Sequence, residues 1–217
     1  MSQNTTNSGK QVYQYIIESI KNATMPPGFR IKENDLVKNT GLSRTPIREA
    51  ISILINEGLI TNDQKRGLII TELDQSMIAQ LYEMREVLEG AAARLAAQHA
   101  SDVEIGILEN ILTKQSQLNT LEEIIKNNKI FHNTLYQCAH NKFLLKTIQE
   151  IENSLLLLGT TTLSYPDRQL QSHQEHLQIL NALKNRDSKK AKEFAQIHIK
   201  EAYKIRLNRF LIERIDF

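Results

Sequence analysis

Apolar positions near the start of the chain recur at the spacing of an α-helix. The residues on this apolar face are Val12, Tyr13, Ile16, Ile17 and Ile20. The spacing predicts a helix from about residue 10 to about residue 23, because Pro26 and Pro27 cannot continue it. Residues 1–9 are polar and rich in Asn, Ser and Thr, so we expect a disordered arm there.

Two short helices joined by a tight turn follow. Residues 32–39 form the first helix, and Gly41 lies in the turn. Ser43 or Thr45 is placed to cap the second helix, which ends at Gly58. Two short helices around a tight glycine turn make a helix-turn-helix unit.

A β-hairpin is predicted directly after this unit. Two short apolar runs flank a polar tip that contains Lys65, Arg66 and Gly67. A helix-turn-helix followed by such a hairpin is a winged-helix domain, and we assign it to residues 10–73.

The basic residues of this domain lie where a winged helix meets DNA. Arg44 and Arg48 are four residues apart, on one face at the amino end of the third helix, the part that reads base edges in the major groove. Lys65 and Arg66 would reach phosphates or the neighbouring minor groove. Arginine pairs on helix faces are more often solvated surface, so the coincidence of both features is what favours DNA contact.

A specific run of residues spans the turn and the third helix: Gly41-Leu42-Ser43-Arg44-Thr45-Pro46-Ile47-Arg48-Glu49-Ala50, followed by Glu57-Gly58-Leu59-Ile60. This run resembles the DNA-binding domain of the GntR family of bacterial transcription regulators. The resemblance implies that Arg44, Thr45 and Arg48 read the operator, with Arg66 and Gly67 of the wing beside them. Ser43 and Lys65 are further candidates for DNA contact. Asn34 stands where many relatives carry an arginine, and its amide can still bond a phosphate or an adenine edge.

The rest of the chain, residues 74–217, follows a helical pattern throughout. Ser101 and Thr120 open capping boxes, and Asp187 can cap the last helix. The expected helices are 75–99, 102–118, 121–139, 141–162, 167–185 and one from about 188 nearly to the end. About six helices form a compact bundle, so the predicted fold is mainly α, with a small hairpin wing.

Three histidines fall on separate helices of this bundle. They are His132, His176 and His198. Neutral imidazole is the commonest metal ligand, and bundles build metal sites from facing helices. Asn128 lies one turn before His132, and His173 is a further candidate, whereas His99 and His140 are interpreted as surface residues. Spacing alone is equally compatible with packed or surface histidines.

A second set of residues extends the resemblance over nearly the whole chain. It comprises Tyr82-Glu83-Met84-Arg85-Glu86-Val87-Leu88-Glu89, Phe131-His132, Asn141, Glu175-His176 and His198. These residues look like the FCD effector-binding domain, in the branch related to the fatty-acid regulator FadR. Many such domains hold a divalent metal with one aspartate and three histidines, and the metal helps to bind a small carboxylate effector.

The FCD resemblance implies a metal site in this chain. By position, His132, His176 and His198 would hold Zn²⁺ or Ni²⁺, and Asn128 occupies the aspartate position. An amide oxygen offers a dipole in place of a full negative charge, so metal affinity should be lower than with aspartate.

Arg85 is a candidate for binding the effector. It lies amid an apolar stripe of the 75–99 helix, made of Leu81, Met84, Leu88 and Leu95, which we expect to be buried. A buried guanidinium needs an anion, either an effector carboxylate or an internal partner such as Glu89, Glu150 or Glu152.

Composition excludes disulfide-bonded, cysteine-zinc and membrane-spanning proteins. The single cysteine, Cys138, excludes an intrachain disulfide and a cysteine-based zinc cluster, which fits a cytoplasmic protein. The longest aliphatic run, residues 155–158, is far shorter than the roughly 18 residues that span a membrane. A net charge of +2 alone does not indicate nucleic acid, so the placement of the basic residues carries that inference.

We therefore expect a ligand-responsive transcription regulator, a repressor rather than an enzyme. A homodimer should bind a short inverted repeat in double-stranded DNA, because two-fold dimers match palindromic sites. An architectural DNA-binding protein without an effector is one alternative. A metal-dependent hydrolase is another, although no general base such as the glutamate of His-Glu-x-x-His is identifiable.

Overall fold

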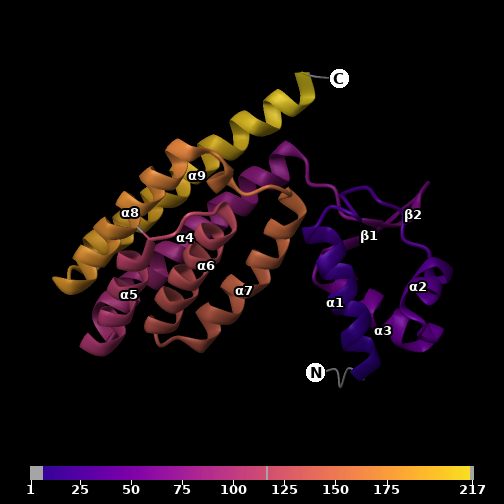
Figure 1. Ribbon diagram of the computed structural model, residues 1–217, viewed down its shortest axis with the longest axis horizontal. Coiled ribbons are helices and arrows are strands. Elements are labelled where there is room, and N and C mark those ends of the chain that lie inside the picture. Colours follow the sequence, from indigo (N-terminus) through magenta and orange to yellow (C-terminus); the bar gives the residue numbers. More distant parts are fainter. Residues whose placement is uncertain (1–6, 116, 216–217) are drawn as a thin grey trace. The chain divides into compact units, whose positions relative to one another are not determined.

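The computed structural model describes residues 7–115 and 117–215 and divides the chain into two compact units (Figure 1). The first unit contains the chain up to Asp74 together with Glu150–Gly159. The second contains Gln75–Gln149 and the residues from Thr160 onward. Each unit has its own apolar core.

The first unit contains the predicted winged helix. Its elements are α1 (Asn7–Lys21), α2 (Glu33–Thr40), α3 (Arg44–Asn56), β1 (Ile60–Asp63) and β2 (Gly67–Ile70). Residues 7–9, which we expected in the arm, belong to α1, and residues 1–6 lie outside the described residues. The two strands pair antiparallel, with Ile60 opposite Ile70 and Asp63 opposite Gly67, which confirms the hairpin.

The helices of this unit pack as the periodicity predicts. α1 lies against α3, and Val12, Ile16, Ile47 and Leu54 are fully buried between them. Burying an aliphatic side chain of this size contributes about 1.5–3 kcal/mol. Gly41 ends α2 in the left-handed conformation, at φ 69°, so a glycine there makes the tight turn without strain.

The expected cap of α3 differs in one respect. Ser43 occupies the position before the helix with an extended backbone, but its hydroxyl makes no capping hydrogen bond. Thr45 lies inside the first turn, next to the buried Pro46. Neither hydroxyl therefore acts as the helix cap.

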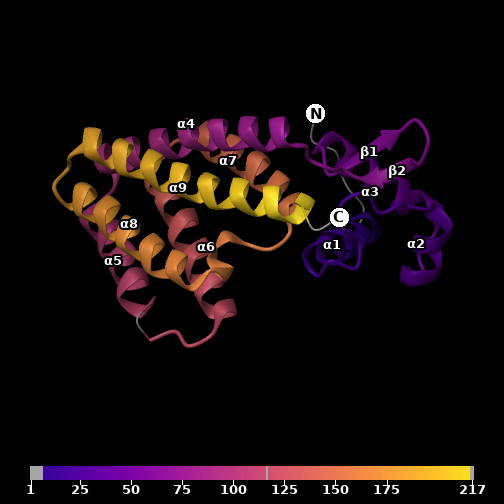
Figure 2. The same cartoon turned by 90° about the horizontal axis from the view of Figure 1, so that it is seen from above.

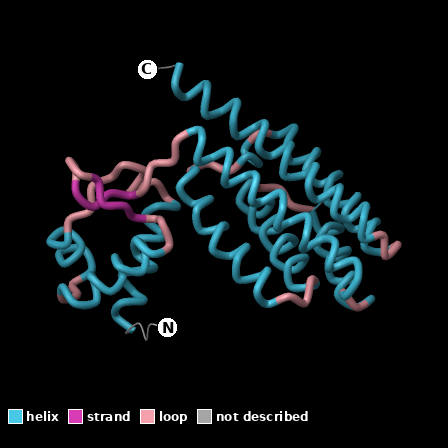
Figure 3. Tube along the Cα trace, turned by 180° about the vertical axis from the view of Figure 1, so that it is seen from behind, coloured by secondary structure: helices cyan, strands magenta, loops and turns pink. Residues whose placement is uncertain are grey.

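The second unit is a helical bundle, seen from two further sides in Figures 2 and 3. Its helices are α4 (Gln75–His99), α5 (Asp102–Gln115), α6 (Leu121–Cys138), the first part of α7 (Lys142–Leu155), α8 (Pro166–Lys184) and α9 (Ser188–Ile215). Both capping boxes are confirmed, Ser101 with Glu104 and Thr120 with Glu123. None of the described helices is long and apolar enough to cross a membrane.

The fourth expected helix of this region, 141–162, is too long. α7 ends at Leu155 and continues as a 3-10 turn, η1 (Leu156–Leu158). Gly159 then takes φ 67°, which a right-handed helix cannot include. A second 3-10 turn, η2 (Thr162–Ser164), precedes α8.

The two longest helices, α4 and α9, pack along each other (Figure 2). The buried face of α4 is rich in small residues, including Ala92, Ala93, Ala96 and Ala97. A Cβ on Gly90 would lie 2.8 Å from the Gln196 side chain on α9. These small residues allow the two backbones to approach closely.

The apolar stripe of α4 that we expected to be buried is buried only in part. Met84 is 45% exposed, while Leu81, Leu88 and Leu95 are half-buried. The expectation that this stripe faces the interior holds only in part: Leu88 and Leu95 pack against the small buried cluster around Ala92, whereas Met84 is exposed.

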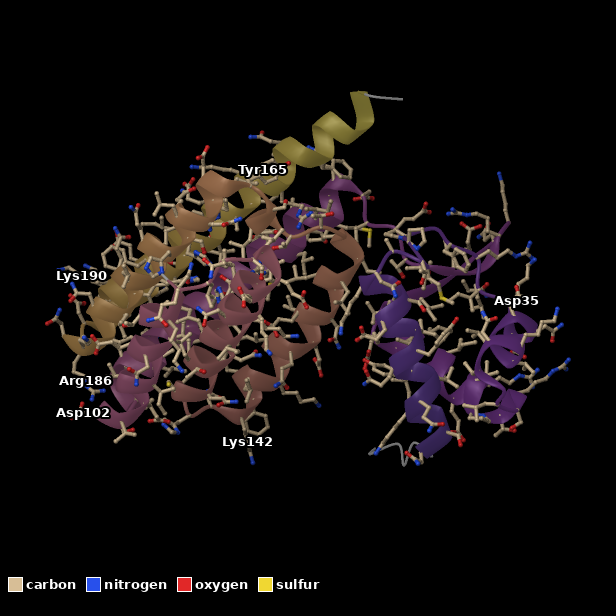
Figure 4. The ribbon with its side chains drawn as sticks, viewed as in Figure 1. Asp35, Asp102, Lys142, Tyr165, Arg186 and Lys190 are labelled. Carbon is tan, nitrogen blue, oxygen red and sulfur yellow. The ribbon has the colours of Figure 1, made fainter. Side chains whose placement is uncertain are left out.

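An ion pair joins the start of α5 to the turn between α8 and α9. Arg186, in the turn between α8 and α9, donates to Asp102 at the start of α5 over 2.6 Å, and both lie at one end of the bundle (Figure 4). The carboxylate side chain of Asp102 is almost fully exposed, so this pair adds little to stability.

Candidate DNA-binding surface and metal centre

The amino end of α3 presents the predicted base-reading residues to solvent. Arg44, Thr45 and Arg48 are all exposed. Arg44 donates to the amide oxygen of Asn34 at 3.2 Å. Arg48 donates through Nε to both carboxylate oxygens of Glu33, at 3.0 and 3.1 Å. α2 thus orients both arginines of α3.

This contact with Glu33 favours the charged form of Arg48. Its hydrogen bond to the Glu33 carboxylate raises the pKa of Arg48 above the usual value, so the guanidinium remains charged. Because the pair is exposed to water, phosphates or base acceptors can compete for the same donors.

The hairpin tip is held by its own acidic residue. The backbone amides of Lys65 and Arg66 donate to one oxygen of Asp63, at 2.9 and 2.7 Å. The Arg66 guanidinium donates to Glu72 at 2.5 Å. Gly67 takes φ 77°, which lets the chain enter β2 from the tight tip. The two cations of the tip are exposed, on a hairpin with a defined shape.

Three helices of the second unit bring the predicted histidines together. His132 comes from α6, His176 from α8 and His198 from α9, and all three are buried. One nitrogen of each lies within 4.8 Å of the others. Three buried imidazoles that share one point have the donor set of a metal site.

A buried carboxylate fixes the orientation of His198. Oε2 of Glu175 lies 2.6 Å from Nδ1 of His198 and 2.7 Å from Nη1 of Arg168. Burial alone would raise the pKa of Glu175, but the hydrogen bond from His198 and the Arg168 guanidinium outweigh it and lower the pKa. An ionised Glu175 only accepts hydrogen bonds, so Nδ1 of His198 carries the proton and its Nε2 lone pair is free for a cation.

His132 has the same kind of support from another helix. Oε2 of Glu89, on α4, lies 3.2 Å from Nδ1 of His132. The other oxygen of Glu89 accepts from Nε of Arg85 at 3.0 Å. Burial would raise the pKa of Glu89, yet the Arg85 charge and His132 hold it far below the usual range. An ionised Glu89 therefore directs the other nitrogen of His132 away from itself.

His176 completes the group without a carboxylate partner. Its ring stacks on Phe131 with centroids 4.3 Å apart, and its buried Nδ1 has no hydrogen-bond partner. Its Nε2 lies 3.4 Å from Nε2 of His198. Two nitrogens on a tetrahedral Zn²⁺, each about 2.0–2.1 Å from the metal, are separated by about 3.3–3.4 Å. The spacing of this pair fits a shared metal ion.

The electrostatics of the group also favour a cation. Burial is the largest factor that lowers the pKa of His198, to about 4, with the Glu175 hydrogen bond opposing it. Burial and the neighbouring histidines lower the pKa of His176 well below its usual value. Both rings are therefore neutral near pH 7, and neutral imidazole is the form that binds metals.

The remaining candidates are not among the three converging histidines. Asn128 is half-buried on α6, one turn before His132. His173 is half-buried outside the group of three, and burial lowers its pKa. His99 and His140 are exposed, which confirms the sequence interpretation.

Arg85 is paired inside the protein. Its guanidinium contacts Glu89 at 2.8 Å and lies over the Tyr82 ring, 5.0 Å from the centroid. Of the internal partners that the sequence left open, Glu89 is the one in contact. Arg85 acts on the histidine group through this carboxylate.

Sequence reasoning missed the charged residues that orient the others. Glu33, Glu89, Glu175 and Arg168 were not assigned to either site. Arg168 is only 2% exposed, and its Nε is buried without a hydrogen-bond partner. A charged residue on the otherwise apolar face of a predicted helix could have indicated them, as Glu89 does among the alanines of α4.

Comparison with protein families identifies both units. Residues 8–70 match the family described as bacterial regulatory proteins, gntR family, and residues 80–201 match the FCD domain. The Nta operon transcriptional regulator of Aminobacter aminovorans is 34% identical over 82% of this chain and 84% of its own length. The HTH-type transcriptional repressor RspR of Escherichia coli is 25% identical over 88% of this chain and 86% of its own length.

A solved structure has the same fold. McbR/YncC of Escherichia coli superimposes with a TM-score of 0.74 over 94% of this chain and 99% of its own, at 20% identity. At that identity the likeness concerns the fold alone.

Proposed function

The chain belongs to the GntR family of bacterial transcription regulators, with a C-terminal FCD domain, and we propose that it is a metal-assisted repressor controlled by a small carboxylate. Members of this family bind DNA and are regulators rather than enzymes. The repressor role, the metal, the effector and the homodimer are the parts proposed here.

The operator is read by the amino end of α3. Arg44 and Arg48 enter the major groove and donate to base edges, and Thr45 lies between them. Ser43 and Asn34 border this surface, and the hairpin tip places Lys65, Arg66 and Gly67 on the adjacent backbone or minor groove. A two-fold homodimer doubles this surface and matches a short inverted repeat.

One observation carries the metal proposal: two buried carboxylates aim two of three converging imidazoles at one point. His132, His176 and His198 would hold Zn²⁺ or Ni²⁺, the ions that suit imidazole ligands. Asn128, one turn before His132 on α6, would add an amide oxygen, which is a weaker ligand than a carboxylate. The bound ion would supply a positive charge with open positions for a carboxylate oxygen.

The residues around the metal ligands set the charge of the site. Arg85 with Glu89 and Arg168 with Glu175 form two internally neutral pairs. Because imidazole binds a metal in its uncharged form, the three ligands would leave the charge of a bound divalent ion without compensation, which favours an anionic effector. Arg85 is a positioning residue in this proposal, because its charge is already paired with Glu89.

Regulation follows from differential binding. If the effector binds more tightly to one conformational state of the dimer, it shifts operator affinity by the ratio of those affinities. The DNA-reading surface and the histidine group lie in different units, so the effector acts on DNA affinity indirectly.

Elemental analysis of protein purified without a metal-affinity column tests this proposal. We expect about one Zn or Ni per chain in the natural sequence, because the three donors are preoriented. His176→Ala should lose the metal and keep operator binding, whereas the surface variant His99→Ala should retain both.

Absence of metal from the natural protein, together with no uptake of added Zn²⁺ or Ni²⁺, would contradict the metal proposal. A metal content unchanged by His176→Ala would show that the ion binds elsewhere.

A further inference from the structure

The two arginines at the amino end of α3 differ in what holds them. Arg44 donates to the neutral amide oxygen of Asn34, and its positive charge has no carboxylate partner among the described residues. Arg48 donates through Nε to both carboxylate oxygens of Glu33, so its charge is paired within the protein. Two cations one turn apart on α3 therefore offer DNA the same donor groups with different net charges.

The contact with Glu33 uses only one edge of the Arg48 guanidinium. Nε lies 3.0 and 3.1 Å from the two carboxylate oxygens, whereas neither η nitrogen donates to any residue in the described part of the chain. The side chain of Arg48 is 65% exposed, so its remaining donors are accessible. Two parallel N–H groups at the end of a guanidinium match the O6 and N7 acceptors of a guanine in the major groove.

The Glu33 carboxylate also changes which acceptors suit Arg48. A guanine edge is uncharged, so it can accept from the η nitrogens while Glu33 keeps Nε. A phosphate carries a full negative charge, and the nearby carboxylate repels it. An arginine without such a partner gains affinity from any phosphate, whatever the sequence. The ion pair therefore favours a base edge over the DNA backbone.

The wing contains a similar arrangement. Nη2 of Arg66 donates to the carboxylate of Glu72, which follows β2, and to Asp63 on β1 at 3.3 Å. Two of the three arginines assigned to the DNA-binding surface thus have carboxylate partners inside the same unit. Charge compensation is therefore a recurring feature of this surface rather than a single contact.

We propose that Glu33 is a specificity-determining residue, which reserves Arg48 for a guanine edge and suppresses binding to DNA of unrelated sequence. This inference rests on the operator-reading surface of the proposed function. Specificity is a difference between two affinities, and a charge that weakens the wrong contact increases that difference. Glu33 acts through Arg48, so it is a positioning residue.

Glu33→Gln tests the charge of this residue, because the amide oxygen can still accept from Nε. Binding to a duplex of random sequence should tighten by about 8-fold at about 0.1 M salt, and its salt dependence should steepen by about 0.9, the value of one phosphate contact. Glu109→Gln is the matched control, because it removes one carboxylate from an exposed ion pair with Lys184 in the bundle. It should change neither quantity. Fluorescence anisotropy at several salt concentrations measures both.

The double variant Glu33→Gln/Arg48→Ala shows whether Glu33 acts through Arg48. Once the guanidinium is gone, removal of the Glu33 charge should have a much smaller effect on binding to the random duplex. An equal gain with and without Arg48 would reveal a general effect of one negative charge near DNA, and would overturn the inference.

Selection of duplexes from a randomised library measures specificity directly. The natural protein should enrich a guanine at one position of the site, and Glu33→Gln should lose about fivefold or more of this preference while other positions keep theirs. Unchanged preferences at every position would contradict the role of Glu33 and leave the operator-reading surface intact. A natural protein that enriches no sequence would overturn both.

Discussion

At the scale of single residues, the histidine group depends on two buried carboxylates. Each contacts the Nδ1 atom of one histidine and leaves the other ring nitrogen to the candidate metal site. Glu175 and Glu89 remain ionised because each has an arginine beside it, Arg168 and Arg85 respectively. Removing either arginine would leave an uncompensated buried charge, which typically costs about 3–5 kcal/mol. The two ion pairs therefore hold the geometry of the imidazoles as well as their protonation.

The lowered pKa values of the histidines predict a pH dependence for the metal-free protein. Between the usual pKa of 6.5 and the folded value of about 4 for His198, the unfolded chain binds protons that the folded chain excludes. The contribution of this histidine to the free energy of unfolding should therefore be complete above pH 6.5 and should be lost as the pH falls through this window. Each such histidine contributes at most about 1.4 kcal/mol per pH unit.

Urea unfolding in the presence of a chelator, at neutral pH and at about pH 5, checks this. His198→Gln should show a shallower decrease than the natural protein, because one of the two shifted imidazoles is gone. A decrease of the same steepness in both proteins would assign it to other groups.

At the scale of elements, α2 does more than support α3 within the helix-turn-helix. Glu33 and Asn34 on α2 hold the side chains of Arg48 and Arg44 at the exposed end of α3. An arginine that is already oriented loses less side-chain entropy when it meets a base. These polar contacts between the two helices therefore prepare the surface that reads DNA.

Arg48→Ala should weaken operator binding by about 1–3 kcal/mol and relax specificity at one base pair, because a bidentate contact to a base edge is lost. Lys114→Ala, an exposed cation on α5, is the control for the general loss of one charge. Fluorescence anisotropy with the operator and with single-base variants measures both effects. Equal affinity and equal selectivity for Arg48→Ala would remove this residue from the base-reading surface.

At the scale of the whole molecule, regulation requires that effector binding in one unit and DNA binding in the other depend on the same conformational equilibrium. The compact units have separate cores, so an effector in the bundle alters DNA binding only by favouring one state of the whole dimer. Such coupling is reciprocal: the operator must change effector affinity by the same factor.

Small carboxylates should raise the melting temperature of the metal-loaded protein and change the operator dissociation constant by about 5–150-fold. A chelator or His176→Ala should abolish both effects without abolishing operator binding. Calorimetric titration of the effector, with and without operator, should give the same coupling factor. Stabilisation without any change in operator affinity would separate ligand binding from regulation.

The sequence by itself determined the elements and the family of this protein. Local signals were sufficient for α1 to α3, the hairpin, α4 and both capping boxes, because helix period, caps and turn glycines act within a few residues. The boundary of α7 was missed because the apolar run 155–158 concealed the change to a 3-10 turn after Leu155, and the left-handed Gly159 then ends that turn.

Tertiary structure alone decided which residues meet. The convergence of His132, His176 and His198 depends on the packing of three helices far apart in the chain, as do the contacts of Glu89 and Glu175. The buried face of α4 was decided in the same way, because two faces of that helix are apolar and its packing against α9, α6 and α8 selects the alanine-rich face. Sequence periodicity describes one helix at a time, whereas the choice among faces is made by the partner.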